Sequence, residues 1–251
     1  MIKFENTFVS GFEAAIRGMR NPMNSWEKSD SGYCGDIHCS DCPHEAEAEQ
    51  ADGYCYRSLT NFVVGKQDLQ LMEKLANAGN DHSKFLRMIN VTVDITAPRY
   101  WWTEMDTYKV GTVRNSCSTM HKIHEKEFTL DDFSYEHLKQ FEWKTETDET
   151  VTHKAHNFVI PLENLILTLN IARNRYLETK DKDYWWQMIQ LLPQSYNQRS
   201  TVQLNYQVLR TIRNSDRRNH KLDEWREGFM QWIDNLPYAK ELIVNEKNSG
   251  K

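Results

Sequence analysis

The sequence lacks the short motifs that identify the largest enzyme classes. Its 251 residues contain no Walker-type phosphate loop, no G-x-G-x-x-G turn, no H-E-x-x-H zinc motif and no G-x-S-x-G elbow. No apolar run approaches the about 18 residues of a membrane span, and the first residues, MIKFENTF, lack the apolar stretch of a signal peptide. We therefore expect a cytoplasmic protein that has no membrane partner.

Excess basic charge is missing as well. The net charge is −5 and the pI is about 6.0, whereas a protein that binds duplex nucleic acid presents a strongly basic face. Duplex DNA or RNA is therefore excluded as the expected partner. A chain of 251 residues can bury roughly three quarters of its unfolded surface as one domain, so a substantial core is expected.

The middle of the chain combines a strand, a short helix and a polar segment. Residues 87–96 alternate between apolar and polar side chains, which predicts a half-buried strand. Pro98 then begins a short helix that ends at about Met105. Residues 107–119 carry too many hydrogen-bonding groups to be satisfied inside a core, so they are predicted to line a ligand site.

Apolar spacing predicts further helices. Three of them have a predicted cap: residues 10–20 with Ser10, 68–79 with Asp68 and 128–141 with Thr129. Three more cover residues 162–172, 184–192 and 223–236. A strand is predicted over residues 199–203, and a helix begins after it at Asn205. Residues 29–55 are polar and cysteine-rich, without an apolar period, which indicates an inserted loop rather than a second domain.

Four cysteines cluster in this inserted loop. Cys34, Cys39, Cys42 and Cys55 follow the pattern C-x4-C-x2-C-x12-C, with His38 and His44 as alternative ligands. Thiolates at this spacing suit a structural zinc ion. The first three also fit an iron–sulfur pattern, and free or oxidised thiols are the third interpretation.

A fifth cysteine and one arginine are candidate site residues. Cys117 lies in the polar segment, where Lys109, Arg114 or His121 could lower its pKa and make it a nucleophile; the alternative is a small buried thiol. Arg199 lies in a predicted strand, where an unpaired guanidinium is costly, so it should have an acidic or phosphate partner.

Two segments resemble the flavin-dependent thymidylate synthases. LLPQSYNQRSTVQLNYQVL, from Leu191 to Leu209, is similar to the family's L-P-x-x-x-x-x-R-x-x-x-x-x-N-x-R-x-L. The stretch after the A-P helix is similar in layout to the family's R-H-R-x-x-S-x-N-E-x-S-x-R. It differs in letters, with T-Y-K at residues 107–109 in place of R-H-R, and Gln207 replaces the second arginine of the other block.

The resemblance implies an α/β (α+β) fold like that of the thymidylate synthase complementing protein, with a central, mainly antiparallel sheet packed with helices. It implies a single domain over residues 1–251 that carries the inserted loop at 29–55. It also implies a homo-oligomeric flavoprotein, usually a homotetramer, that binds FAD between subunits and uses folate and NADPH. A bacterium or a bacteriophage-infected cell is the expected setting.

The same resemblance implies roles for individual residues. Cys117 would lie beside the pyrimidine as the catalytic residue; the substrate-binding residues would be Arg199, Glu104, Asn115 and Arg114; and Tyr108, Lys109, Ser83 and Asn205 would contact the flavin.

Three functions remain open at this point, and the third of them, after the two described next, is a purely structural or interaction protein, which the aromatic and arginine content would suit. The first is a divergent methyltransferase that transfers a one-carbon unit to a deoxyuridylate-like pyrimidine nucleotide. The second is a non-catalytic protein that binds and sequesters a nucleotide, as a viral immune-evasion protein would. The non-catalytic function predicts that the catalytic signature motif is replaced while the anion-binding site is retained.

Overall fold

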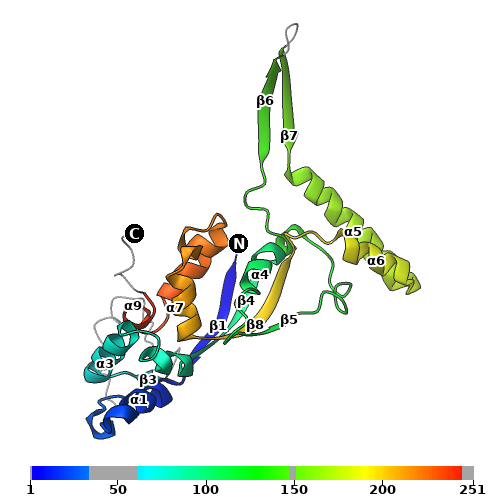
Figure 1. Cartoon of the computed structure of the whole chain (residues 1–251). Coiled ribbons are helices and arrows are strands. Elements are labelled where there is room, and N and C mark those ends of the chain that lie inside the picture. Colours follow the sequence, from blue (N-terminus) through cyan, green and yellow to red (C-terminus); the bar gives the residue numbers. More distant parts are fainter. Residues whose placement is uncertain (1, 34–60, 147–150, 245–251) are drawn as a thin grey trace. The chain divides into compact units, whose positions relative to one another are not determined.

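The computed structural model describes residues 2–33, 61–146 and 151–244 (Figure 1). The described residues form two compact units, and each is considered by itself. Unit 1 contains residues 96–104 and 116–199 with their gap, and unit 2 contains the described parts of 2–95, 105–115 and 200–244. The inserted loop predicted at residues 29–55 lies outside the described residues from residue 34 onward.

A four-stranded sheet runs through the chain in the order β1-β4-β8-β5. Its strands are β1 (Lys3–Ser10), β4 (Asn90–Pro98), β5 (Val113–Ser116) and β8 (Asn197–Asn205). Gln203 donates to Asn90 at 3.3 Å and Thr201 donates to Asp94 at 2.6 Å. Residue numbers rise along one strand as they fall along the other, so β4 and β8 are antiparallel.

The alternation predicted for β4 is confirmed. Val91, Val93 and Ile95 are buried, and the intervening polar residues are only half-buried. A buried apolar face opposite a polar one is the pattern of a sheet covered on one side. Two strands of this sheet were missed: β1 was not predicted, and β5 was read as part of the polar loop.

Helices cover the core of unit 2. They are α1 (Phe12–Arg20), α3 (Lys66–Asn77), α7 (Tyr206–Arg213), α8 (Met230–Asp234) and α9 (Ala239–Leu242), with a 3-10 turn at Ser83–Met88 that contacts α1, α3 and α7. The single helix predicted over 223–236 is instead a π turn at Glu224–Phe229 followed by α8. The turn buries both Trp225 and Phe229.

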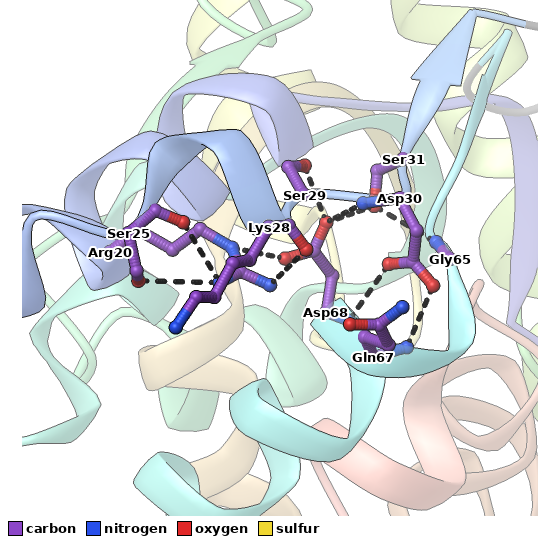
Figure 2. A network of polar contacts seen from close by, with 9 residues as sticks. All are labelled: Arg20, Ser25, Lys28, Ser29, Asp30, Ser31, Gly65, Gln67 and Asp68. Atoms are coloured by element: carbon purple, nitrogen blue, oxygen red, sulfur yellow. Dashed lines mark hydrogen bonds and ion pairs between the residues drawn. The ribbon is translucent and has the colours of Figure 1, made fainter.

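A buried ion pair ties α1 to α3 in unit 2 (Figure 2). Arg20 Nε donates to Asp68 Oδ1 at 2.7 Å, and the two residues are 4% and 0% exposed. The hydroxyls of Ser29 and Ser31 each donate to Asp68 Oδ2 at 2.6 Å, while Arg20 Nη2 donates to the carbonyl of Lys28 at 3.0 Å. The charges are therefore paired and hydrogen-bonded, as burial requires.

Two predicted helix caps are wrong. Asp68 lies inside the first turn of α3, and Asp30 supplies the cap instead, since its carboxylate accepts from the backbone N–H groups of Gln67 and Asp68 at 2.9 and 3.0 Å. Ser10 is the last residue of β1, and α1 follows Gly11 at φ +94°. A Cβ there would lie 2.0 Å from the carbonyl oxygen of Met88, so the position requires glycine.

Unit 1 is built on a helix pair, α5 (Val159–Thr179) and α6 (Lys182–Leu191). Both helices were predicted, with shorter or shifted ends. The short helix after Pro98 was also predicted, and α4 (Arg99–Met105) is observed there. The apolar core of the pair is shared with the loop before it, and its buried residues are Ile123, Phe128, Phe133, Leu162, Leu169, Ala172, Met188 and Leu192.

The helix predicted over residues 128–141 is wrong. Only Leu130–Asp132 forms a 3-10 turn, closed by a capping box between Thr129 and Asp132. Phe133 then forms an isolated antiparallel bridge with Tyr196. The spacing of these apolar residues is set by packing against α5 and α6, not by a helix of their own.

An unpredicted hairpin precedes α5 and leads directly into it (Figure 1). Its strands are β6 (Gln140–Glu146) and β7 (Val151–Asn157), paired antiparallel from Gln140 opposite Asn157 to Glu146 opposite Val151. Taken together, helices and an antiparallel sheet make up the described parts of the chain, as the expected fold class requires. None of the described helices is long and apolar enough to cross a membrane.

Candidate functional site

A pocket of about 490 Å³ opens in unit 2 beside the start of α7. Seven of its ten lining residues have polar side chains, and two of these are cations; the residues are Arg87, Thr107, Tyr108, Lys109, Val110, Gly111, Asn205, Gln207, Val208 and Thr211. Tyr108, Lys109 and Asn205 are three of the four residues that the sequence assigned to cofactor binding. The volume lies in the range of small-molecule sites.

Gly111 allows one wall of this pocket to close. It has φ +77°, and a Cβ there would lie 2.7 Å from Asn205 Nδ2. The turn that carries Tyr108 and Lys109 begins where Tyr108 N donates to the carbonyl of Met105 at 3.0 Å. A side chain at residue 111 would push this turn away from Asn205.

Asn205 forms the opposite wall and caps α7. Its Oδ1 accepts from the backbone N–H of Val208 at 3.0 Å, as predicted for a helix that begins at Asn205. The first backbone N–H groups of a helix carry partial positive charge. Arg87 and Lys109 add two full charges to the same pocket. The arrangement favours an anion such as a phosphate.

Tyr108 is held from behind by an arginine. Arg217 Nε donates to Tyr108 Oη at 3.2 Å, and its guanidinium lies 5.8 Å from the Tyr108 ring and 5.2 Å from the ring of Trp225. The hydrogen bond and the cation–π contact with the Tyr108 ring limit the movement of the phenol.

Ser83, the fourth predicted cofactor residue, does not line the pocket but contacts a residue that does. It is buried, and its hydroxyl donates to Gln207 Oε1 at 3.2 Å. Gln207 itself lines the pocket. Ser83 thus orients a lining residue.

Cys117 and Arg199 lie side by side in unit 1. Cys117 N donates to the carbonyl of Arg199 at 2.9 Å, and Gln198 Nε2 donates to the carbonyl of Cys117 at 2.9 Å. Both Cys117 and Arg199 are exposed, so the buried-thiol interpretation of Cys117 is wrong. Burial raises the pKa of the neighbouring Tyr196 above its usual value, and interaction with Asp132 and then Cys117 raises it further.

Glu104 is half-buried near the end of α4, in the same unit. In that helix Trp102 Nε1 donates to the carbonyl of Gln198, the neighbour of Arg199, at 2.9 Å. The helix and the Cys117–Arg199 pair are thereby linked through β8.

Arg114 and Asn115 belong to unit 2, on β5. Arg114 Nη1 donates to both carboxylate oxygens of Asp106 at 2.9 Å, and its Nε donates to Ser200 Oγ at 3.0 Å. This arginine is therefore already committed to a carboxylate of the same chain. Asn115 is exposed.

The predicted metal ligands Cys34, Cys39, Cys42 and Cys55 lie outside the described residues. Among residues 2–33, 61–146 and 151–244, no three or more histidine, cysteine or acidic side chains come together as a metal site.

Several pocket residues were missed from the sequence. Arg87 was read as the start of a strand, although it lies in the 3-10 turn that ends at Met88. Val208 and Thr211 follow Asn205 by about one and two helical turns, so the predicted helix start was the available signal for them. Nothing in the sequence marked Arg217 as the partner of Tyr108.

Comparison with known proteins identifies the fold. No protein-family model and no curated protein matches the chain. Two crystal structures of the flavin-dependent thymidylate synthase ThyX from Helicobacter pylori, both with FAD and dUMP, are similar to it at 16% sequence identity. One has a TM-score of 0.58 and covers 95% of this chain and 98% of its own; the other has 0.59 and covers 100% of both. The expected fold is confirmed over the length of the chain.

Proposed function

We propose that the chain binds a nucleotide through the pocket at the start of α7, and that this nucleotide is a flavin such as FAD. The observation that carries the proposal is the closure of the Tyr108–Lys109 turn against Asn205, which gathers two cations and a helix N-terminus around one cavity. The ThyX structures of the same fold contain FAD and dUMP, which supports a nucleotide of this kind.

The donor set of the pocket fits the anionic part of such a ligand. Arg87 and Lys109 supply charged donors, and Asn205 supplies a neutral one. Each hydrogen bond to a charged group contributes roughly 1.5–3 kcal/mol. Tyr108, fixed by Arg217, offers an aromatic face for a planar ring.

For an enzyme on this scaffold we propose one-carbon transfer to a deoxyuridylate-like nucleotide, with folate and NADPH as co-substrates. A bound flavin would supply hydride chemistry. Arg199 would bind the substrate phosphate, Glu104 and Asn115 would contact the base or sugar, and Cys117 would lie beside the pyrimidine. The backbone hydrogen bond from Cys117 N to the carbonyl of Arg199 holds the two residues next to each other, which supports a substrate site that contains both.

The alternative is a nucleotide-binding protein without turnover, and one contact favours it. Arg114, expected among the substrate-binding residues, donates from Nη1 to both carboxylate oxygens of Asp106 and from Nε to Ser200 Oγ, so these donors are committed within the chain. Arg213 is likewise paired with Asp234 at 2.6 and 2.9 Å, and Arg210 is bonded to the carbonyl of Leu242. Thr107, which stands where the resembled family has an arginine, carries no charge with which to bind an anion.

We further propose that the whole chain forms one domain with the insert at residues 29–55 and that the insert binds structural zinc through its four cysteines. We also propose that the protein is a homotetramer in the cytoplasm of a bacterium or of a bacteriophage-infected cell.

Lys109→Ala tests the nucleotide pocket. The purified parent protein should show the visible absorption of oxidised flavin, or a rise in melting temperature when FAD is added. Lys109→Ala should weaken FAD binding about tenfold or more, because one charged donor is lost. The matched control is Lys74→Ala, an exposed lysine on α3 away from the pocket.

The outcomes separate the two functions. Flavin that is reduced by NADPH and reoxidised on addition of deoxyuridylate and methylenetetrahydrofolate supports the enzyme, whereas binding without turnover supports the sequestering protein. Equal FAD affinity in Lys109→Ala and the parent contradicts the pocket assignment.

A further inference from the structure

The β6–β7 hairpin forms a two-stranded sheet of its own, and both of its faces are exposed (Figure 1). Its side chains at residues 140–145 and 153–156 are all exposed. Two of them are large aromatic rings, since Phe141 is 48% and Trp143 45% exposed. A two-stranded hairpin is at best marginally stable in water, and rings this exposed add little to its folding. Their presence therefore indicates a contact with a partner.

The strand register groups the aromatic side chains with basic and imidazole side chains. Phe141 lies opposite His156, and Trp143 lies opposite Lys154. Residues two apart along a strand point to the same face, so the two cross-strand pairs are neighbours about 6.8 Å apart. The surface that these four residues form is called the aromatic face below.

Two further side chains extend the aromatic face toward α5. Lys139 Nζ lies 5.1 Å from the centroid of the Phe141 ring. Phe158, which is 45% exposed, meets the rings of Phe141 and His156 edge to face at 5.8 and 4.6 Å. These contacts limit the movement of the rings, which reduces the conformational entropy that a ligand must remove on binding.

The two faces of the hairpin differ in charge. Lys139 and Lys154 belong to the aromatic face and its extension, and the described side chains there include no carboxylate. Glu142 and Lys144 point to the opposite face, where Glu142 Oε1 accepts from Gln140 Nε2 at 3.1 Å. The aromatic face is therefore complementary to a ligand that combines planar apolar groups with negative charge.

We propose that the aromatic face binds single-stranded nucleic acid. Each nucleotide offers a planar base and an anionic phosphate, which match an aromatic ring and the cation or imidazole opposite it in the pairs Trp143–Lys154 and Phe141–His156. Unpaired bases stack on exposed aromatic side chains of sheets in this way. The rings are about 6.8 Å apart, twice the about 3.4 Å between stacked bases, so two neighbouring bases must separate to reach them. A duplex does not allow this.

An anionic membrane is the competing partner, and the arrangement of the face disfavours it. A segment that lies in a membrane surface buries a continuous apolar area and keeps its cations on the polar side. Here Lys154 lies directly opposite Trp143, and His156 lies directly opposite Phe141. Insertion of the rings would therefore bury polar groups beside them at a cost in solvation.

This surface shares no residue with the nucleotide pocket beside α7 or with the proposed substrate residues. An oligonucleotide bound to the aromatic face should therefore stay bound when FAD and dUMP are added to saturation. Displacement by either nucleotide would place the oligonucleotide in the sites proposed above and overturn the inference. Failure of FAD binding leaves the inference intact.

The first experiment measures binding of fluorescent oligothymidylate and oligouridylate of about 12 nucleotides to the whole protein by anisotropy. Trp143→Ala should weaken binding at least about fivefold, and Trp143→Phe should retain most of it because a stacking ring remains. Trp186→Ala, at a ring 47% exposed on α6, is the matched control and should bind like the parent. Circular dichroism verifies that each variant is folded. A parent that does not bind below about 0.1 mM, or equal losses in Trp143→Ala and Trp186→Ala, overturns the proposal.

The second experiment compares two lysines on opposite faces of the same hairpin. Lys154→Ala should weaken binding and reduce the slope of log affinity against log salt concentration by about 0.7, the value for one phosphate contact of a single strand. Lys144→Ala should leave both unchanged. Equal effects of the two substitutions would indicate general electrostatic attraction and overturn the assignment to the aromatic face. Binding of the parent to phosphatidylserine vesicles but to neither oligonucleotide would overturn it as well.

Discussion

Asn205→Asp separates nucleotide binding from folding at the start of α7. The substitution keeps the side-chain volume and the oxygen that accepts from Val208 N at 3.0 Å. Aspartate caps helices as well as asparagine does, and its charge is favourable at a helix N-terminus. The melting temperature should therefore stay the same or rise slightly.

Anion binding should fall sharply in the same variant. The Nδ2 group facing Gly111 becomes an oxygen, which removes a donor to the ligand worth roughly 1.5–3 kcal/mol. Two like charges about 4 Å apart near a protein surface repel by about 4 kcal/mol, so a carboxylate placed beside a phosphate adds repulsion of that order. With tenfold per 1.4 kcal/mol, FAD affinity should drop by at least about a hundredfold.

Calorimetric titration of FAD, paired with thermal unfolding of the unliganded protein, provides the assay. Asn205→Ala is the control, because it loses the cap, at a cost of about 1 kcal/mol in stability, without adding charge. Parent-like FAD affinity in Asn205→Asp would refute the placement of an anion at this helix start. A large loss of stability would refute the assignment of Asn205 as a cap.

Three further variants test parts of the molecule away from the pocket. Asp68→Asn should lower the free energy of unfolding by about 3–5 kcal/mol in urea titrations, since Arg20 would stay buried without a counter-charge; Asp234→Asn, which breaks the half-exposed pair with Arg213, should cost about 1 kcal/mol or less. A similar cost for both would contradict the role given to burial. Elemental analysis should find zinc in the parent protein and none in the variant that carries both Cys39→Ser and Cys42→Ser. A parent protein without zinc would end the zinc proposal.

The sequence predicted the elements whose local signals agree with their packing. β4 alternates because one of its faces is buried, and α7 begins at Asn205 because this side chain satisfies the helix start. The stretch from Phe128 to Phe141 failed because its apolar residues have helical spacing while their packing partners, on α5 and α6, are distant in sequence. Tertiary contacts of that kind leave no local signature.

Part of the pocket could be predicted from the sequence, because some of its residues lie in segments with recognisable local patterns. Tyr108, Lys109 and Asn205 were assigned through a resemblance in layout, and the structure places all three around one cavity. Arg87 and Arg217 could not be found that way, because one lies in a turn read as a strand and the other contacts Tyr108 from 109 residues away.

The short pairing of β2 (Gly32–Tyr33) with β3 (Phe62–Val63) has a consequence for the length of the segment between them. Both ends of the intervening segment are anchored on the body of the protein, since Ser29 and Ser31 bond to Asp68 and Val64 N donates to Tyr238 Oη. Once the ends are fixed, doubling the length between them costs only about 0.6 kcal/mol of chain entropy. A change in the number of residues between Tyr33 and Phe62 should therefore cost the anchored scaffold little free energy through chain entropy.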